Sequence, residues 1–388
     1  MIMSIDVLKQ SPIGFLKEDS TGLRVVEMNP QTDPRWEAFV ESHPDGTIYH
    51  HPAWLDALQR EYGQRGLYLA CESATGDLLA VLPLLYTRGL PFGLGGGLTR
   101  PRLSSLPRTP VAGPLSTDRR ATIAVIQAAQ QRIHQNPGVQ LQIKAQRPEL
   151  DGLVEGIACV PWRLSYLLRL PRRSGGPFRI PDAQHRAKVR WAVNKATKLG
   201  VVVRPAESEA ELHAWYLLYL DTMRRNAVPP RPYRFFAALW ELLRPLGMMQ
   251  LLLACKQEAG RTTIVAGSIF FMFGRTVSYA FNGSRQEDLS LRPNDVIQWQ
   301  AINDACAKGF DVFDFGEVPE GNTALAKFKS KWGSEPTRLY RYQAPGPEIA
   351  SYAGTNLKSY ATRFTEVVWR GLPLSVTAWL GDRIYSRL

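Results

Sequence analysis

Hydrophobic and polar positions recur with different periods along the chain, and the second half carries the clearest pattern. From residue 201 onward the periods predict a strand, two helices, three strands, a helix, a strand, a short helix and a last strand. Ser208 and Glu211 have the spacing of a capping box, which predicts a helix start near Ser208. The expected elements span residues 201–204, 207–225, 232–246, 249–256, 264–273, 276–282, 293–308, 312–315, 324–331 and 337–342.

The first half shows a weaker version of the same order. Its expected strands span residues 23–27, 66–72, 78–86, 92–98, 139–144 and 162–170, and its expected helices span 34–42, 52–62 and 118–135. We interpret this order as an internal duplication of one α/β unit. The repeat is inferred from the order of the expected elements, because the halves share no visible sequence identity. The expected organisation is an N-terminal extension (1–22), a first domain (23–170), a basic linker (171–184), a second domain (185–343) and a tail (344–388).

Positive charge is concentrated where the two halves meet. Residues 163–204 contain eleven Lys or Arg and one acid, while the whole chain has a net charge of +12. Within this segment, residues 185–199 predict an amphipathic helix with a basic polar face. That face is either an ordinary solvated surface or a binding surface for phosphates, as in a nucleotide-activated substrate, a lipid pyrophosphate or tRNA.

Composition narrows the class of protein. With 45% hydrophobic and 21% charged residues, the chain is neither disordered nor a coiled coil. Its apolar runs are shorter than the roughly 20 residues of a membrane helix, and its start lacks a signal-peptide pattern. Four widely spaced cysteines and six scattered histidines show no metal or redox spacing, so we expect no metal site and a reducing, cytoplasmic location.

The tail after residue 344 is dense in apolar and basic residues. Pro373 divides it into two expected short helices. A basic amphipathic helix with tryptophans suits the anionic cytoplasmic face of an inner membrane. The alternative is a helical pair that folds onto the second domain.

The order of elements resembles the fold of the Gcn5-related N-acetyltransferases (GNAT), and two such units in tandem resemble the Fem-type (FemAB/FemX-like) peptidyltransferases. Phe313–Gly316, followed by Phe328–Gly333, resembles the strand end and the F-K-x-x-[FW]-G signature of that family. The likeness is greatest to the branch associated with exopolysaccharide and protein sorting. Further segments that resemble this family or branch are 49–54, 82–84, 105–107, 188–199, 215–225 and 372–388.

This resemblance implies an α/β fold of two tandem GNAT-like domains with mixed central sheets, followed by a C-terminal helical tail. Members of the family transfer an amino acid from aminoacyl-tRNA to an amine of a peptidoglycan precursor. The second domain would carry the catalytic motif.

Two features depart from the family pattern. Glu317 stands where the branch commonly has an arginine after the Asp-Phe-Gly run. Residues 283–294 lack the [RQ]-x-x-G-x-[GA] pattern that binds acetyl-CoA, and a loop that cradles pyrophosphate with backbone N–H groups needs glycines. The second departure favours another donor and leaves a modified CoA site open.

Acyl transfer to an amine requires a deprotonated amine, a polarised carbonyl and a stabilised oxyanion. The resemblance implies a role for Lys329, whose ammonium, beside Phe328, could stabilise the oxyanion; the alternative is a surface lysine. Asp314, at the end of a buried strand, could act as a base or orient the amine; the alternative is a cap for the following helix.

Further candidates could bind the two substrates. Tyr279 and Asn282 lie on the strand that splays in acetyltransferase-like folds, and Arg292 and Asn294 open the next helix, where they could meet a phosphate of the donor. The candidates for acceptor binding are Trp54, Arg186 and Arg190, because arginine suits phosphate. Packing, turn and solvated-surface roles are the alternatives for these residues, and the core is the alternative for Trp54.

Three functions follow. The leading one is an N-acyl or aminoacyl transferase that acts on an amine of a cell-envelope or exopolysaccharide precursor. The second keeps the fold and takes its acyl group from an acyl-CoA or carrier thioester; the third is a non-catalytic scaffold in an envelope assembly. We expect no tightly bound cofactor, an aminoacyl-tRNA or acyl-CoA co-substrate, and a phosphate-bearing or lipid-linked partner. The oligomeric state stays open.

Overall fold

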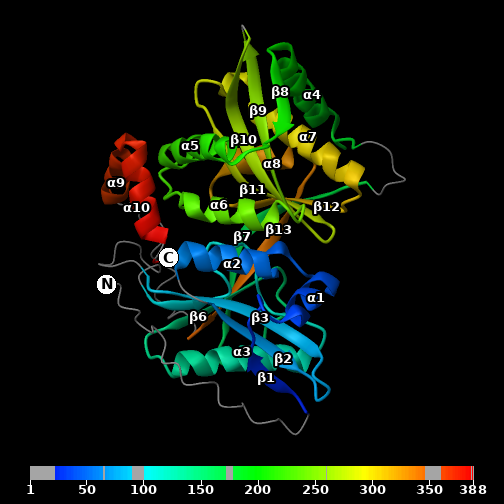
Figure 1. Cartoon of the computed structure of the whole chain (residues 1–388), viewed down its shortest axis with the longest axis vertical. Coiled ribbons are helices and arrows are strands. Elements are labelled where there is room, and N and C mark those ends of the chain that lie inside the picture. The colour runs from blue at the N-terminus through cyan, green and yellow to red at the C-terminus, as the bar shows by residue number, and fades with distance from the viewer. Residues whose placement is uncertain are drawn as a thin grey trace. The chain divides into compact units, whose positions relative to one another are not determined.

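The structure is a computed structural model that describes residues 22–63, 66–89, 100–171, 178–258, 260–345, 360–385 and 387. The chain forms two compact units (Figure 1). Of the described residues, unit 1 contains those from 22 to 162, 339–345 and 387, and unit 2 contains those from 163 to 338 and 360–385. Each unit is described by itself below.

Unit 1 is a mixed sheet covered by helices on both faces. Its elements are β1 (Arg24–Glu27), α1 (Pro34–Ser42), α2 (Pro52–Tyr62), β2 (Leu67–Glu72), β3 (Leu78–Thr87), β4 (Arg102–Ser104), β5 (Leu115–Ser116), α3 (Arg119–His134) and β6 (Gln140–Ala145). The strand order is β1-β2-β3-β4-β6-β13, with β5 beside β3; β4 and β6 are parallel. Helix α3 lies against one face, and α1 and α2 lie against the other (Figure 1).

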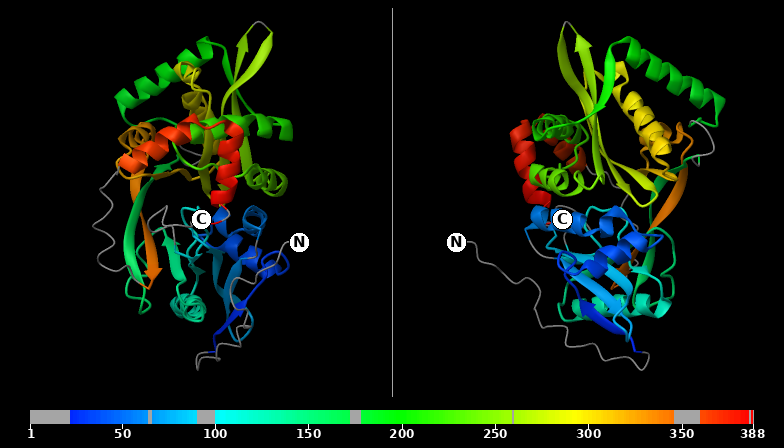
Figure 2. Two further views of the ribbon diagram at one scale, coloured as in Figure 1. Left: turned by 90° about the vertical axis from the view of Figure 1, so that its left-hand side faces the viewer. Right: turned by 45° about the vertical axis from the view of Figure 1, so that its right-hand side comes forward.

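Unit 2 repeats this plan with longer strands. Its elements are β7 (Ala158–Arg169), α4 (Ala183–Lys198), β8 (Val201–Pro205), α5 (Glu209–Arg225), α6 (Tyr233–Leu243), β9 (Met249–Glu258), β10 (Arg261–Phe273), β11 (Thr276–Ser284), α7 (Pro293–Lys308), β12 (Val312–Val318), α8 (Thr323–Ser330) and β13 (Glu335–Ala344). The strand order is β7-β12-β11-β10-β9-β8, in which β11 and β12 are parallel. Helices α5 and α6 cover one face, and α7 and α4 cover the other (Figure 2).

The last strand of each half belongs to the other unit's sheet. Strand β7, which ends the first half, pairs antiparallel with β12 through residues 164–169. Strand β13, which ends the second half, pairs antiparallel with β6 through Tyr340–Ala344. The expected domain ranges 23–170 and 185–343 follow chain order, whereas the compact units change within these two strands.

Most expected elements are present, with differences at strands. Helices 34–42, 52–62 and 293–308 have the expected bounds, and Ser208 caps α5 by accepting a hydrogen bond from the Glu211 N–H. The prediction that a strand ends at Gly316 is wrong, because β12 continues to Val318 through an irregularity. The short strands β4 and β5 were not expected, and the expected strand 92–98 lies outside the described residues.

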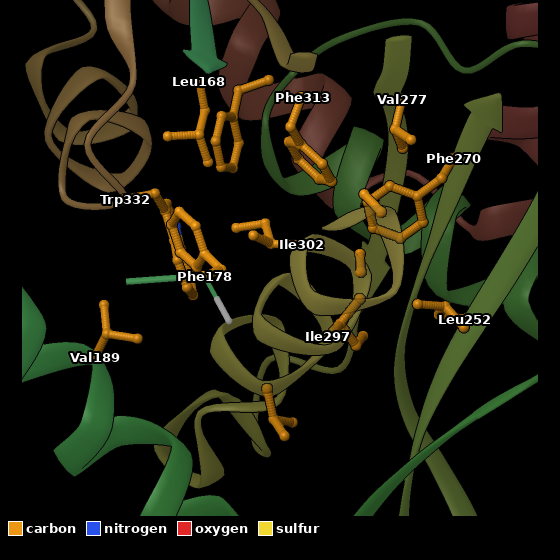
Figure 3. Packing of buried hydrophobic residues seen from close by; sticks show 14 of the residues in the cluster. Leu168, Phe178, Val189, Leu252, Phe270, Val277, Ile297, Ile302, Phe313 and Trp332 are labelled. Carbon is orange, nitrogen blue, oxygen red and sulfur yellow. The ribbon is translucent and has the colours of Figure 1, made fainter. Parts of the chain in front are cut away.

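A single apolar cluster joins the sheet of unit 2 to α7. Phe270, Val277 and Phe313 point from three neighbouring strands toward Ile297 and Ile302 of the helix (Figure 3). Trp332 closes this cluster and is fully buried, with its ring stacked on Phe315. The other face carries an aromatic group from α5, α6 and β11: Trp215, Tyr216, Tyr219, Phe235, Phe236 and Phe281.

The tail forms two helices, α9 (Tyr360–Gly371) and α10 (Leu374–Tyr385), on either side of Pro373 as expected. Helix α10 packs on α5. Gly381 permits close contact, since a Cβ there would lie 2.6 Å from the carbonyl oxygen of Pro230. Among the described residues, no helix combines the length and the apolarity that crossing a membrane requires.

Candidate active site

The candidate site lies where β11 and β12 part. These parallel strands are paired over only three residues, from Thr276–Val312 to Ser278–Asp314. Beyond this point β11 continues to Ser284 along β10, and β12 continues along β7. Two parallel strands that separate leave backbone groups that no longer pair with each other, and the C-terminal ends of such strands are where α/β sheets bind ligands.

Lys329 reaches this point from α8. Its side chain is buried, with 4% of the residue exposed, so the surface-lysine interpretation is wrong. Its Nζ donates hydrogen bonds to the carbonyl oxygens of Gly316 (2.8 Å) and Glu317 (3.0 Å). Burial lowers the pKa of Lys329 to about 8, while the nearby carboxylate of Asp314 opposes the shift. A lysine ammonium has three N–H donors, so one remains for a substrate.

Asp314 faces the same point from β12. Its Oδ1 accepts hydrogen bonds from the Gly316 N–H (2.7 Å) and the Ser165 hydroxyl (2.9 Å). Burial raises the pKa of the Asp314 carboxyl, and these hydrogen bonds together with Lys329 act in the opposite direction. The helix-cap interpretation is wrong, because the N–H that Asp314 binds belongs to its own strand. A carboxyl with a raised pKa is suited to accept a proton near neutral pH.

Gly316 shapes the irregularity that brings these groups together. Its φ is +74°, a left-handed conformation that glycine adopts without the steric cost of a Cβ. In this conformation the carbonyl oxygens of Gly316 and Glu317 both receive the ammonium of Lys329. A Cβ built on Gly316 would lie 3.5 Å from the Tyr279 carbonyl oxygen and 3.9 Å from the Lys329 Nζ.

The negative charge at position 317 is balanced within unit 2. Arg163 of β7 lies with its guanidinium 3.5 Å from the carboxylate of Glu317. The family pattern places an arginine after Asp-Phe-Gly. In this chain the positive charge is on Arg163 of the neighbouring strand instead. The pair is partly exposed, with 40% and 19% of the side chains accessible, so its contribution to stability is small.

Phe328 does not contact the carboxyl group of the site. Its half-buried ring receives the Lys331 ammonium, which lies 4.2 Å from the ring centroid. Lys331 also forms an ion pair with Asp295, a buried residue in the first turn of α7. Lys331 thus links the Phe328 ring of α8 to the start of α7.

The donor candidates on β11 face the core of unit 2. Tyr279 packs against Phe270 at 5.6 Å between ring centroids, and burial raises its pKa. The side-chain oxygen of Asn282 accepts a hydrogen bond from the Ser268 hydroxyl at 3.0 Å. Both residues are half-buried on the strand that leaves β12. The carbonyl oxygen of Tyr279 lies near Gly316, 3.5 Å from where a Cβ of that residue would stand.

The start of α7 holds the other two donor candidates. Arg292 is exposed and precedes the helix in a left-handed conformation (φ +61°). The Oδ1 of Asn294 and both amide atoms of the fully buried Gln298 have no hydrogen-bond partner among the residues that the structure describes. Unpaired buried polar atoms are uncommon in folded proteins. The start of α7 therefore carries buried polar atoms whose hydrogen bonds the described residues do not supply.

The three acceptor candidates have different structural environments. The guanidinium of Arg186 donates to the carbonyl oxygens of Ile180 and Pro181, so this residue tethers the segment before α4. Arg190 is exposed on α4. Trp54 is 2% exposed and packs edge-on against Tyr49 in unit 1. This position favours the core interpretation of Trp54.

One group of possible metal ligands occurs among the described residues, in unit 1. Glu37, Glu41 and His51 bring their ligand atoms within 4.8 Å of one another. The Ala53 N–H donates to Nδ1 of His51, so the proton of the neutral ring is on Nε2, which faces Glu37 at 3.2 Å. A protonated nitrogen has no lone pair for a metal. The arrangement is a histidine–carboxylate hydrogen bond at the start of α2.

Ser165 and Gly316 were missed by the sequence analysis. Ser165 lies 149 residues before Asp314 and joins it only because β7 pairs with β12. No local pattern marks such a serine. Gly316 carried a signal, since a glycine directly after a buried strand often marks a left-handed residue or a bulge. It was interpreted as a strand end.

One protein-family model matches the part of the chain that contains the candidate site. Residues 183–330, which include Asp314 and Lys329, match the acetyltransferase (GNAT) domain family. No curated protein sequence matches the chain. The domain match confirms the acyltransferase class that the motifs predict.

Solved structures share the fold at low sequence identity. The crystal structure of FemX has a TM-score of 0.60 at 15% identity, covering 82% of this chain and 96% of FemX. The structure of L-PGS from Bacillus licheniformis has a TM-score of 0.53 at 15% identity, covering 92% and 99%. The C-terminal domain of a putative lysylphosphatidylglycerol synthetase from Agrobacterium fabrum has a TM-score of 0.52 at 11% identity, covering 84% of this chain and 95% of that domain. These likenesses confirm the tandem GNAT-like α/β fold and support the Fem-like resemblance.

Proposed function

We propose that this acyltransferase moves an acyl or aminoacyl group onto an amine of a phosphate-bearing cell-envelope or exopolysaccharide precursor. The observation that carries the proposal is the placement of Lys329 and Asp314 at the parting of β11 and β12 within the acetyltransferase domain. Unit 2, which carries both residues, would perform the chemistry.

Asp314 would remove the proton of the attacking amine. Its carboxyl is held in one orientation by two donors on Oδ1, from Ser165 and Gly316. The second oxygen is then available to the amine. As the N–C bond forms, the proton moves to Asp314, and it then passes to the leaving sulfur or ribose oxygen as the old acyl bond breaks.

Lys329 would stabilise the oxyanion that forms on the carbonyl. Two of its N–H groups bind the carbonyl oxygens of residues 316 and 317, which fixes the direction of the third. A preoriented donor of this kind acts without reorganisation during the reaction. With a pKa lowered to about 8, most of the lysine is protonated at neutral pH.

The donor is proposed from the charge and loop pattern. GNAT acyltransferases use acyl-CoA as a co-substrate without a tightly bound cofactor. Here the stretch between β11 and α7 lacks the glycines of a pyrophosphate loop. The residue before the helix, where the backbone is left-handed, is Arg292. This favours aminoacyl-tRNA as the donor, with an acyl-CoA or carrier thioester as the second candidate.

The proposed setting is the cytoplasmic side of a membrane. FemX and a lysylphosphatidylglycerol synthetase are among the proteins with the same fold, and the second name refers to a lipid product. Four apolar residues of the tail are exposed: Val367, Val368, Val376 and Trp379. We propose that this surface makes peripheral contact with an anionic bilayer.

A direct test follows the donor. The full chain is incubated separately with radiolabelled acetyl-CoA and with bulk tRNA charged with labelled amino acids, in the presence of an envelope-precursor extract. We expect label to move to an acid-stable amide in one of the two reactions. Asp314→Asn should abolish this transfer, whereas Asp304→Asn, a half-buried residue near the C-terminal end of α7, should not. Absence of transfer from both donors by folded protein would favour a non-catalytic scaffold.

A further inference from the structure

A tryptophan on the basic helix is exposed between two cations. Trp191 of α4 has 55% of its surface accessible, although large aromatic side chains are usually more buried. The Lys195 ammonium lies 5.4 Å from its ring centroid, and the Arg292 guanidinium lies 5.3 Å from it. Arg292 directly precedes α7. Trp191, Lys195 and Arg292 therefore link α4 to α7, and these two helices pack against each other.

The cations around this ring lack acidic partners. Helix α4 contains no Asp or Glu, and Lys188, Arg190, Lys195 and Lys198 form no ion pair within the described ranges. The same holds for Arg292. The 16 residues of α4 extend for about 24 Å, which is longer than a single phosphate group requires. This face combines an accessible aromatic ring with several cations that no carboxylate neutralises in the part of the chain that the structure describes.

We propose that Trp191 is a stacking platform for the base of a nucleotide, with Lys195, Arg292 and the exposed cations of α4 binding its phosphates. An aromatic ring beside arginine and lysine is how proteins bind single-stranded nucleotides without reading their sequence. The Lys195 side chain is long and flexible, so it can leave the ring to a base and keep its charge beside a phosphate.

The platform is connected to the candidate active site. Arg292 lies three residues before Asp295, which forms an ion pair with Lys331 of the segment that also carries Lys329. Helix α4 packs on α7 (Figure 2). The nucleotide is therefore inferred to be the nucleotide end of the acyl donor, an inference that rests on the proposed acyl transfer. Coenzyme A and the 3′ end of a tRNA share this chemistry.

The test measures binding without turnover. A fluorescein-labelled single-stranded RNA of twelve nucleotides ending in CCA is titrated with the full chain by fluorescence anisotropy, and CoA is used as a competitor. Trp191→Ala is expected to weaken the binding of the RNA or of CoA by about tenfold or more, the effect of losing one base stack. Trp191→Phe, which keeps an aromatic ring, should lose less.

Trp379 provides a matched control. It is also 55% exposed and has an arginine, Arg383, 4.6 Å from its ring centroid, but it lies on α10 of the tail. Trp379→Ala should leave nucleotide binding unchanged. The pair Lys195→Gln and Arg292→Gln should reduce the slope of log affinity against log salt by about 0.7 for each phosphate that the variant no longer neutralises.

The outcomes separate this inference from the proposed function. Displacement of the RNA by CoA at comparable concentration assigns the platform to a CoA donor, and resistance to CoA assigns it to RNA; both support the platform. Equal binding by Trp191→Ala, Trp379→Ala and the unmodified chain, or no binding of either probe at low salt, would overturn it. Lys329→Met should bind both probes normally, so a failure of catalysis leaves this measurement intact.

Discussion

The parallel strand pair of each unit ends differently. In unit 1, β4 and β6 are paired from Arg102 to Ser104, and the chain that follows β4 stays bonded to β6. The Ser105 N–H donates to the Gln142 carbonyl oxygen, and the Lys144 N–H donates to the Ser105 hydroxyl. In unit 2, the corresponding pair β11 and β12 separates after Ser278 and Asp314. The same plan is thus closed in one unit and open in the other.

A buried lysine stands at each of these strand ends. Lys144 is 3% exposed and donates to the carbonyl oxygens of Leu106 and Thr109. Lys329 is 4% exposed and donates to those of Gly316 and Glu317. Lys144 holds a loop in which Leu106 has a left-handed φ of +57°, whereas Lys329 lies near the carboxylate of Asp314. A buried lysine by itself therefore indicates a structural role. A buried lysine next to a carboxylate, where two parallel strands separate, indicates a candidate catalytic residue.

The sharpest test replaces each lysine with methionine. Lys329→Met should lower acyl transfer by about 100-fold or more, the effect of losing one oxyanion donor. Lys144→Met should leave the chemical step unchanged and instead reduce the free energy of unfolding by about 1–3 kcal/mol, because two buried carbonyl groups lose their donor. Single-turnover rates and denaturant unfolding separate the two effects. Equal losses of transfer in both variants would make Lys329 a structural lysine like Lys144.

The pH dependence sharpens the role of the open pair. The pKa of Lys329 is lowered to about 8, so its ammonium, and with it the transfer rate, should decline as the pH rises above 8, by about tenfold per pH unit. The pKa of Asp314 is raised by burial, so the rate should also fall as the pH decreases through that raised value.

Lys329→Arg keeps a positive charge at all accessible pH values and is the control for the alkaline limb. The limb should move to higher pH in this variant, measured as the transfer rate under saturating substrates. An alkaline limb that remains near pH 8 would assign it to another group, such as the acceptor amine.

The bulge in β12 is tested by a smaller change. Gly316→Ala should reduce the free energy of unfolding by about 1–2 kcal/mol, since alanine resists the left-handed conformation at φ +74°. Gly309→Ala, at φ +80° at the end of α7, should cost a similar amount. Only the first variant should also lower transfer, because it moves the carbonyl groups that orient Lys329. Equal transfer by both variants would separate the bulge from the reaction.

The weakest expected effect concerns the tail that packs on unit 2. The intact chain should bind anionic vesicles weakly and in a salt-sensitive way, and removal of residues 355–388 should abolish this binding. Trp379→Ala is the milder variant, since its ring is exposed and its loss leaves the packing of Gly381 intact. Vesicle co-sedimentation at low salt provides the measurement. An intact chain that ignores vesicles, with a truncated chain that aggregates, would identify the tail as part of the core.

Much of the fold could be predicted because its signals are local. Helices 34–42 and 293–308 both begin at proline, the first is capped by Asp33, and α7 ends at a left-handed glycine, so their bounds agree with the structure. Short strands such as β4 and β5 carry too few residues to show a period, and they form because neighbouring strands pair with them. The capping contact at Ser208 was likewise readable from spacing alone.

The site was predictable only in part. The motif containing Phe328, Lys329 and Trp332 identified the lysine, but not that it is buried or which carbonyl groups it binds. Phe328 was placed beside the reaction by its position in that motif, whereas the structure turns its ring to Lys331. Burial depends on what packs over a residue, which a motif does not state.

By itself, the sequence determined the order of elements, the duplication, the basic helix and the lysine of the motif, because each rests on residues that are close in the chain. Only the tertiary structure decided that β7 and β13 change units and that Ser165 binds Asp314 across 149 residues. It also decided that β11 and β12 part while β4 and β6 stay joined. These features depend on strand register and on hydrogen bonds between distant segments, which no local period encodes.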